Sequence, residues 1–347
     1  FASKTDAQLR KTYWLFNLMN RARVVNLGTF FIKLALKLHL PIKNIIRATI
    51  FEQFCGGETI SDCKAAIDTL GSSKIGTILD YSVEGEDTEE NFEITANEIL
   101  LTIEQASDSK YIPFAVFKIS GIGSSDLLTK IQQKQILSSH ETASYQRLQN
   151  RVEKLCQKAY NLNVRIFIDA EESWIQTTID TLAYRMMEKY NKEHAIVYNT
   201  YQFYQHETLS SFKSAYLQAK QQGYYLGGKL VRGAYMEKER IRAKENKYID
   251  PIHQTKEDTD QDYNGAIDFA LEHLEIISLC LGTHNEFSTQ YCAYKMAKLN
   301  VAKNDPRVWF AQLLGMSDNI SFNLSNAGYN VAKYVPYGPI KSVIPYL

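Results

Sequence analysis

The sequence lacks an excess of charge of either sign, because 39 lysines and arginines balance 39 aspartates and glutamates over 347 residues. Phosphate binding needs clustered positive charge, so this balance argues against nucleic acid as a main partner. Long apolar runs are also missing. The best candidate, 30–38, is interrupted by Lys33 and Lys37, whereas a membrane-spanning helix needs about 20 mostly apolar residues. A peripheral membrane contact stays open.

Cysteine is scarce, and none of the five residues forms a C-x-x-C pair: Cys55, Cys63, Cys156, Cys280 and Cys292. An odd number of scattered cysteines predicts reduced, mostly buried thiols of an intracellular protein, with neither a disulfide framework nor a zinc site. The chain begins at Phe1, so we expect the natural N-terminus and any targeting signal to precede it. The many lysines, isoleucines and asparagines favour a bacterial cytoplasmic protein, with the mitochondrial matrix as the eukaryotic counterpart.

Several catalytic signatures are absent as well. The sequence has no P-loop, no H-E-x-x-H pair, no nucleophile elbow and no cluster with metal-ligand spacing, so we expect no metal and little basis for hydrolysis. The G-x-G-x-x-G fingerprint of dinucleotide-binding open sheets is missing too, and the pairs Gly56-Gly57 and Gly121-Ile122-Gly123 are too weak to replace it. A doubly wound sheet is therefore the less favoured fold.

What the sequence does contain is a change of pattern near residue 75. Before it, apolar residues recur at helical spacing over 9–19 and 30–40. After it, short apolar runs alternate with longer amphipathic segments, which is typical of strand-helix repeats and a parallel sheet. Eight such runs are present: 75–83, 112–119, 164–168, 195–201, 229–231, 276–281, 308–314 and 331–335.

Between these runs lie amphipathic helical patterns, each with one apolar face: Tyr145, Leu148, Val152 and Leu155; Ile175, Ile179, Leu182 and Met186; Leu209, Phe212, Tyr216 and Ala219. Eight strands that alternate with helices in a chain of this size predict an α/β fold, a (βα)8 TIM-type barrel. We expect an N-terminal helical segment, 1–70, to pack on a barrel formed by 71–347. The charged stretch 238–262 is predicted to be a long, solvated excursion after the fifth strand.

Polar residues gather where the predicted strands end. Active sites of such barrels lie at the C-terminal ends of the strands, and burying so many ionisable groups in one place is costly unless they serve a purpose. We therefore predict an active site there, suited to an anionic substrate beside an electron-accepting cofactor. The residues include Asp80, Lys118, Asp169, Asn199, Gln202, Lys229, Arg232, Thr283, His284, Gln312, Lys333 and Tyr334.

Nine segments follow one another along the chain, all but the first at a predicted strand end: Phe54-Cys-Gly-Gly-Glu58, Leu79-Asp-Tyr-Ser-Val-Glu-Gly85, Phe117-Lys-Ile-Ser120, Ile168-Asp-Ala-Glu-Glu172, Val197-Tyr-Asn-Thr-Tyr-Gln202, Lys229-Leu-Val-Arg-Gly-Ala-Tyr235, Thr283-His-Asn-Glu286, Gln312-Leu-Leu-Gly-Met-Ser-Asp318 and Lys333-Tyr-Val-Pro-Tyr-Gly338 through Pro345-Tyr-Leu347. Read in order, they resemble the proline dehydrogenase family, especially its stand-alone, mitochondrial-type members. They follow the family's order over nearly the whole barrel. The resemblance implies a (βα)8 barrel with noncovalent FAD, in agreement with the strand count.

The resemblance also implies residue roles. Lys118 would pair with the substrate carboxylate, and Asp169 and Lys229 would stand beside the reacting ring and the flavin. The substrate would further contact Asp80, Glu84, Tyr235, Leu313, Tyr334 and Tyr346. The cofactor would be held by Asp169, Ala170, Asn199, Lys229, Arg232, Gly233, Ala234, Thr283, His284 and Gln312. Asn199 and Lys229 stand where many members have glutamine and arginine, and lysine offers a point charge in place of a planar fork.

The implied reaction is the oxidation of L-proline to Δ1-pyrroline-5-carboxylate. A hydride would pass from C5 of the ring to N5 of FAD, and the electrons would then pass to a membrane quinone, with peripheral association at the inner membrane. The protein orients and tunes, while the redox chemistry belongs to the cofactor.

The match stops at the end of the chain. The family continues after Pro345-Tyr-Leu347 with a helix that carries two adjacent arginines, which complete the carboxylate clamp, and this sequence ends one residue before them. We expect the end to be trimmed. Glu84, which matches the acidic partner of one of those arginines, would lack that partner here.

Alternatives stay open at this stage. Hydroxyproline dehydrogenase would share every cofactor motif, although the bulky ring of Tyr334 leaves little room for a ring hydroxyl. A lyase or aldolase barrel would use Lys118 or Lys229 as a Schiff base, and a noncatalytic relative would bind no proline analogue. Taken singly, His284, Lys118 and Asp169 also have ordinary structural explanations; their joint position at strand ends favours function.

Overall fold

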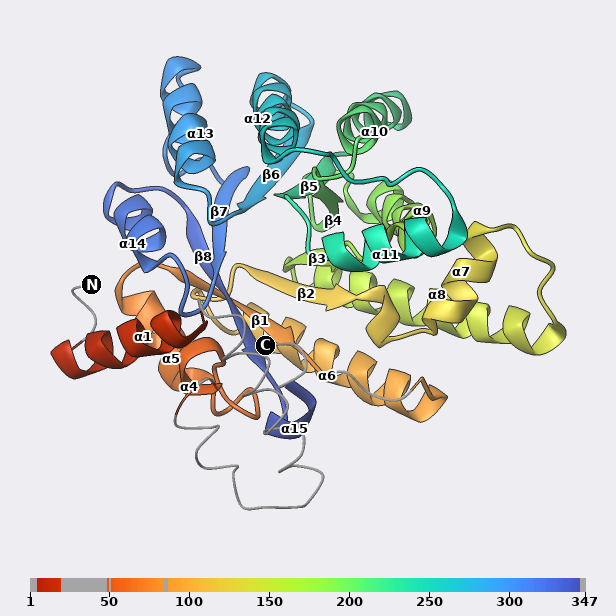
Figure 1. Cartoon of the computed structure of the whole chain (residues 1–347), viewed down its shortest axis with the longest axis horizontal. Coiled ribbons are helices and arrows are strands. Elements are labelled where there is room, and N and C mark those ends of the chain that lie inside the picture. Colours follow the sequence, from red (N-terminus) through yellow and green to blue (C-terminus); the bar gives the residue numbers. More distant parts are fainter. Residues whose placement is uncertain (1–4, 20–48, 50, 84–86, 344–347) are drawn as a thin grey trace.

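The protein is a closed barrel of eight parallel strands in chain order, seen in a computed structural model that describes residues 5–19, 49, 51–83 and 87–343 (Figure 1). Each strand pairs with the next, and β8 closes on β1 from Ala332 beside Gly76 to Tyr337 beside Tyr81. The strands are β1 (Gly76–Tyr81), β2 (Phe114–Lys118), β3 (Arg165–Asp169), β4 (Val197–Gln202), β5 (Leu226–Val231), β6 (Ile277–Gly282), β7 (Val308–Leu313) and β8 (Val331–Tyr337).

Helices surround the barrel on its outer face (Figure 1). They begin at polar caps where the sequence offers them: Ser138 and Glu141 form a reciprocal capping box, and Thr88, Thr255 and Asn285 each accept a backbone N–H. Their bounds are α6 (Glu89–Ser107), α7 (Ser125–Gln132), α8 (Ser139–Asn161), α9 (Ser173–Tyr190), α10 (Thr208–Gln222), α11 (Met236–Asn246), α12 (Lys256–Glu272), α13 (Glu286–Lys298), α14 (Asp318–Asn326) and α15 (Ile340–Val343).

Alternate residues of the strands build two apolar layers, which is why the strands read as nearly continuous apolar runs. One set packs against the helices in the larger core. The other set fills the barrel interior, where Phe114 stacks on Phe167 with ring centroids 4.3 Å apart and Tyr198 meets both rings edge-on. The interior is thus a packed core, and space for ligands is left at the strand ends.

The sequence predictions of the barrel are confirmed, with differences at the edges. Each of the eight predicted runs overlaps a strand, and the three predicted apolar helix faces lie in the core against the barrel. The stretch 238–262 is not a plain solvated loop. Most of α11 and the start of α12 fall within it, and its Glu239 is fully buried, accepting hydrogen bonds from the backbone and hydroxyl of Ser173. The helix predicted over 30–40 lies outside the described residues.

Before β1, the described residues form the helices α1 (Asp6–Met19), α4 (Glu52–Phe54) and α5 (Lys64–Ser72). Phe16 of α1 meets Phe54 of α4 edge-on at 6.0 Å, and Lys11 pairs with Glu52 at 2.7 Å. The chain then reaches the barrel, because Gly57 forms a parallel bridge with Tyr337 of β8. Among the described helices, none combines the length and apolar character that crossing a bilayer requires. All five cysteines fall in the described part of the chain, buried and unpaired.

Candidate active site

A cavity of about 570 Å³ opens at the C-terminal ends of the strands and gathers most of the residues predicted from the sequence. Those present in its lining are Lys118, Asp169, Ala170, Lys229, Arg232, Gly233, Ala234, Tyr235, Thr283, His284, Gln312, Leu313 and Tyr334. Sequence reasoning did not assign a role to several further lining residues, namely Thr200, Gln202, Val231, Lys256, Gly282, Asn285 and Ala311. Of these, Gln202 and Asn285 gave a signal, as polar residues at strand ends.

At the base of the cavity, Lys229 joins two other predicted residues. Its Nζ forms a short ion pair with Asp169 and donates to the Tyr334 hydroxyl at 2.6 Å. The ammonium also lies over the rings of Phe167 and Tyr334, at 5.2 and 4.7 Å from their centroids, where a cation is attracted to the π face. With 6% of its side chain exposed, this lysine presents a fixed positive charge in a nearly dry wall.

Arg232 is held by three protein acceptors on the β5 and β6 side of the cavity. Its guanidinium donates to Asp260, to the Thr283 hydroxyl and to the Ser288 hydroxyl, each at 2.8 Å, and it stacks over the ring of Tyr263 at 4.3 Å. Lys256 also pairs with Asp260. Two cations therefore share one carboxylate beside the cavity, and a bound anion would have to join or replace that carboxylate.

Gly233 occupies a position that only glycine fills without strain. Its φ of +139° lies in a region that other residues avoid, and a Cβ there would stand 2.5 Å from the Tyr204 ring. The backbone can therefore pass close to Tyr204 and turn into the cavity wall. The next residue, Ala234, donates its N–H to the side-chain oxygen of Gln202 at 3.3 Å.

Gln202 links two loops of the site. While its side-chain oxygen accepts from Ala234, its amide nitrogen donates to the carbonyl of Glu171 at 2.6 Å. It thereby ties the loop after β5 to the loop after β3, which follows Asp169 and begins with Ala170. This bridge, invisible in the sequence, shows how β4 serves the site although it supplies no charged group.

His284 is neutral in this setting. His284 lines the cavity and is exposed to it. Loss of hydration within the surrounding protein, followed by the charge of Lys333, nevertheless lowers the pKa of the imidazole to about 4. Its Nδ1 lies 2.9 Å from the Ser317 hydroxyl. At physiological pH the ring therefore offers the cavity a neutral hydrogen-bonding group in place of a second cation.

Asn199 does not fit its predicted contact with a cofactor. Strand alternation places it on the face of β4 opposite Tyr198, whose ring lies in the barrel interior. The Asn199 amide instead donates to Asp180 of α9 at 2.7 Å, and the residue is fully buried between sheet and helix. On this strand the inward positions near the cavity belong to Thr200 and Gln202.

Gln312 borders the cavity, but its amide is already engaged. It donates to the Thr283 carbonyl at 3.2 Å and accepts from Ser321 of α14 at 2.7 Å. The geometry makes it a support for Thr283, so any contact with a cofactor would use the groups that remain. Glu84 and Tyr346 lie outside the described residues.

Lys118 stands where the main cavity meets a second one of about 320 Å³. Tyr235 is common to both linings, and Asp80 lines the second. Asp80 is buried and accepts from the Ser82 hydroxyl at 2.9 Å. Glu171, in the same lining, accepts from the Ser120 backbone at 2.9 Å, and burial raises the pKa of its carboxyl.

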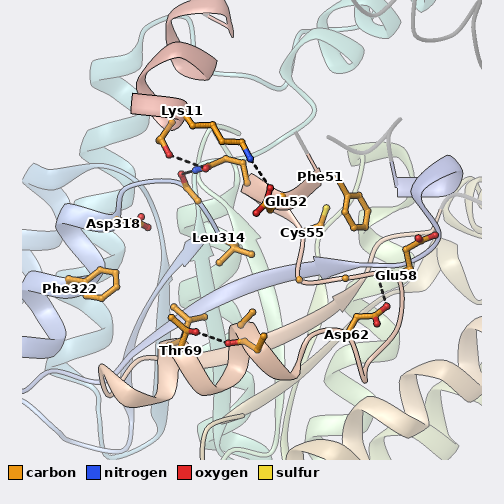
Figure 2. A pocket seen from close by; sticks show the side chains of 18 residues that line it. Lys11, Phe51, Glu52, Cys55, Glu58, Asp62, Thr69, Leu314, Asp318 and Phe322 are labelled. Carbon is orange, nitrogen blue, oxygen red and sulfur yellow. Dashed lines mark hydrogen bonds and ion pairs between the residues drawn. The ribbon is translucent and has the colours of Figure 1, made fainter. Parts of the chain in front are cut away.

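A third cavity, of about 670 Å³, lies on the side of the N-terminal helices (Figure 2). Figure 2 shows Lys11 and Glu52 at its rim and Leu314, Asp318 and Phe322 facing it from the other side. Its described lining includes none of the predicted site residues. The end of β7 lines the active-site cavity, and the loop that follows it lines this one.

Comparison with known proteins agrees with this geometry. The family model for proline dehydrogenase matches residues 63–347. The chain belongs to the proline dehydrogenase family. Among the relatives of this family member is proline dehydrogenase 1, mitochondrial, of Dictyostelium discoideum, which is 30% identical over 392 residues, covering 100% of this chain and 68% of that protein. The human protein of the same name is 39% identical over 213 residues, covering 60% of this chain and 36% of its own length.

Solved structures share the fold of this chain. Proline utilization A from Bdellovibrio bacteriovorus, inactivated by N-propargylglycine, superposes with a TM-score of 0.77 at 18% identity, over 87% of this chain and 32% of that one. The chain thus spans about two thirds of its Dictyostelium relative and about a third of the human and bacterial proteins.

Proposed function

We propose that this chain oxidises L-proline to Δ1-pyrroline-5-carboxylate in proline catabolism, with FAD as cofactor and a quinone as final electron acceptor. The observation that carries the proposal is the group formed by Lys229, Asp169 and Tyr334 at the base of the cavity, within a barrel of the proline dehydrogenase family. The hydroxyproline and Schiff-base alternatives lack a comparable observation. Tyr334 is buried and its hydroxyl is fixed by Lys229, which disfavours a substrate with an added ring hydroxyl.

The residues of the cavity fit FAD by their chemistry. A flavin dinucleotide brings phosphates, and the cations Arg232 and Lys256 both line the cavity. Gly233 and Ala234 bring backbone close to the ligand space, and neutral His284 adds a polar group without charge. Bound FAD would supply the two-electron acceptor that the side chains lack.

The chain's own residues bind and orient the substrate. Lys118 is positioned to meet a carboxylate at the junction of the two cavities, and Leu313, Tyr334 and Tyr235 form apolar walls that suit a pyrrolidine ring. Beside a bound electron acceptor, the positive charge of Lys229 would stabilise the negative charge that develops in the transition state. The burial of Lys229 and Tyr334 keeps water away from them and strengthens their interactions.

The cellular location is inferred from the relatives. The Dictyostelium and human relatives are mitochondrial by name, and this favours the mitochondrial matrix over the bacterial cytoplasm that composition suggested. A peripheral contact with the inner membrane would bring the site to its quinone. The division into a helical segment 1–70 and a barrel 71–347 remains part of the proposal.

A visible absorption spectrum tests the function. We expect the purified protein to show a flavin band that bleaches when L-proline is added without oxygen, and far less with hydroxyproline. A colourless protein that cannot take up FAD would contradict the proposal. A flavin band that proline leaves oxidised would argue for another substrate. Reoxidation by a soluble quinone analogue, faster than by oxygen, tests the acceptor.

Replacing Gly233 by alanine is expected to lower flavin occupancy about tenfold, since the positive φ and the contact with Tyr204 together cost on the order of 1–3 kcal/mol. The ratio of flavin to protein absorbance after FAD titration measures this effect. Gly265→Ala is the matched control, because this glycine lies in α12 and its added Cβ would make only an ordinary contact with Leu209 at 3.6 Å. Equal flavin affinity in the two variants would remove Gly233 from the cofactor site.

A further inference from the structure

The loop that joins β7 to α14, Leu313 to Asp318, is a wall shared by two cavities. Leu313 lines the active-site cavity, whereas Leu314, Gly315 and Asp318 line the third cavity (Figure 2). The loop contains two residues with left-handed backbone, Gly315 at φ 75° and Ser317 at φ 51°. Such a conformation at a serine costs about 1 kcal/mol or more, so contacts from outside the loop must hold it.

Lys333 holds the loop from beneath. It lies on the face of β8 opposite Ala332 and Tyr334, whose side chains belong to the barrel interior. Its side chain is fully buried. The Nζ donates to the Leu313 carbonyl at 3.2 Å, to the Met316 carbonyl, and to the Asp318 carboxylate at 2.9 Å. All three acceptors belong to this loop.

A fully buried ammonium loses several kcal/mol of hydration and regains it only through well-placed partners. Because these acceptors of Lys333 come from the loop, the observed loop conformation compensates the ammonium for its lost hydration. A conformation that moved the acceptors away would leave the buried charge without them. Lysine at this strand position therefore specifies the loop conformation more strongly than an apolar residue would.

Gln53 holds the same loop from the N-terminal side. Its amide nitrogen donates to the Gly315 carbonyl at 3.0 Å, and its side-chain oxygen accepts from the Thr12 hydroxyl of α1 at 3.1 Å. The approach is close, because a Cβ on Gly315 would stand 2.2 Å from the Gln53 carbonyl oxygen. The loop is thus pinned between a buried lysine of the barrel and a glutamine of the N-terminal helices.

The pinned loop reaches the active site at two points. Leu313 projects into the cavity beside Tyr334, and the Leu314 N–H donates to the Tyr334 carbonyl at 2.8 Å. The Ser317 hydroxyl meets His284 Nδ1 at 2.9 Å. A shift of the loop would therefore move an apolar wall of the proline space and break the contact between the Ser317 hydroxyl and His284 Nδ1.

We propose that Lys333 and Gln53 are positioning residues of the active site, which fix the substrate wall at Leu313 and the imidazole of His284 through this loop. The N-terminal helices are then a working part of the catalytic domain, not an independent attachment. The inference rests on the proposed oxidation of proline for its kinetic readout, while the loop contacts themselves can be followed without turnover.

Gln53→Ala tests the proposal on a partly buried residue of α4. We expect KM for proline to rise about fivefold, the effect of one lost hydrogen bond, with kcat within about twofold. In the cofactor-free protein, amide hydrogen exchange of the loop should quicken by a similar factor, and exchange in β3 and β4 should stay unchanged. Glu52→Gln is the matched control. Glu52 lies next to Gln53 on α4, and its replacement removes the ion pair with Lys11 of α1 without changing a contact of the loop.

Lys333→Met removes the inner support and leaves the Asp318 carboxylate buried without this cation. The double variant Lys333→Met/Asp318→Asn removes that charge as well, so it should regain stability while keeping the raised KM and the faster loop exchange. A double variant with normal KM and normal exchange would overturn the inference, as would equal effects of Gln53→Ala and Glu52→Gln. Failure of the proposed function looks different, because the unaltered protein itself would then not be reduced by proline.

Discussion

Lys229→Met is expected to lower kcat/KM for proline by about a hundredfold to a thousandfold, the usual effect of losing one preorganised charge at a reacting centre. Lys229 is nearly buried and pairs with Asp169 and Tyr334. Methionine keeps much of the side-chain length and volume but removes the positive charge. The measurement is the anaerobic rate of flavin bleaching over a range of proline concentrations, which separates binding from the reductive step.

The same substitution should also destabilise the fold, since it leaves the Asp169 carboxylate in the wall without its cation. Breaking a buried ion pair costs about 3–5 kcal/mol. The double variant Lys229→Met/Asp169→Asn removes the stranded charge and should recover most of the stability, but none of the activity. Lys229→Arg keeps the charge and should lose much less activity than Lys229→Met. Comparable activity of Lys229→Met and Lys229→Arg would show that charge at this position has no part in the reaction.

The barrel could be predicted from the sequence because its strands are buried on both faces. Such strands appear as short apolar runs, and the alternation with amphipathic helices then selects the architecture. The prediction was weakest at β5, where the run was placed at 229–231 although the strand begins at Leu226. Gly227 and Gly228 hide it, since glycine has little strand propensity. Tyr198 explains the first of them: a Cβ at Gly227 would stand 2.6 Å from its ring.

The site could be predicted only to the level of strand ends. Motif order and position were enough to bring Asp169, Lys229 and Tyr334 into one cavity. They were not enough to decide which of two neighbouring residues on a strand points toward the cavity, because successive side chains point to opposite faces of the sheet. Asn199 was assigned to the cofactor on this uncertain basis, and the barrel register turns it toward α9. Links between loops, such as Gln202, depend on three-dimensional closeness and leave no mark in the sequence.

The Asn199 position leads to a further expected result, because the burial of its partner Asp180 disfavours the charged carboxylate. Burial raises the pKa of the Asp180 carboxyl from its ordinary value of 3.8 to about 6, although Asn199 and Gln176 donate to it. The folded protein therefore holds this proton at a pH where the unfolded chain has released it. Between pH 3.8 and 6 the free energy of unfolding falls as pH rises, and the loss is complete above pH 6.

Asp180→Asn should accordingly raise the free energy of unfolding by up to about 3 kcal/mol at pH 8, with the gain shrinking toward pH 4. The asparagine oxygen can still accept from Asn199 and Gln176, so the hydrogen bonds survive while the charge is removed. Urea unfolding at pH 5 and pH 8 measures the change, and Asp68→Asn, at an exposed position on α5, controls for the loss of a solvated charge. If Asp180→Asn destabilises the fold equally at both pH values, the carboxylate is needed as an acceptor, and the space behind β4 is a hydrogen-bonded support for the site.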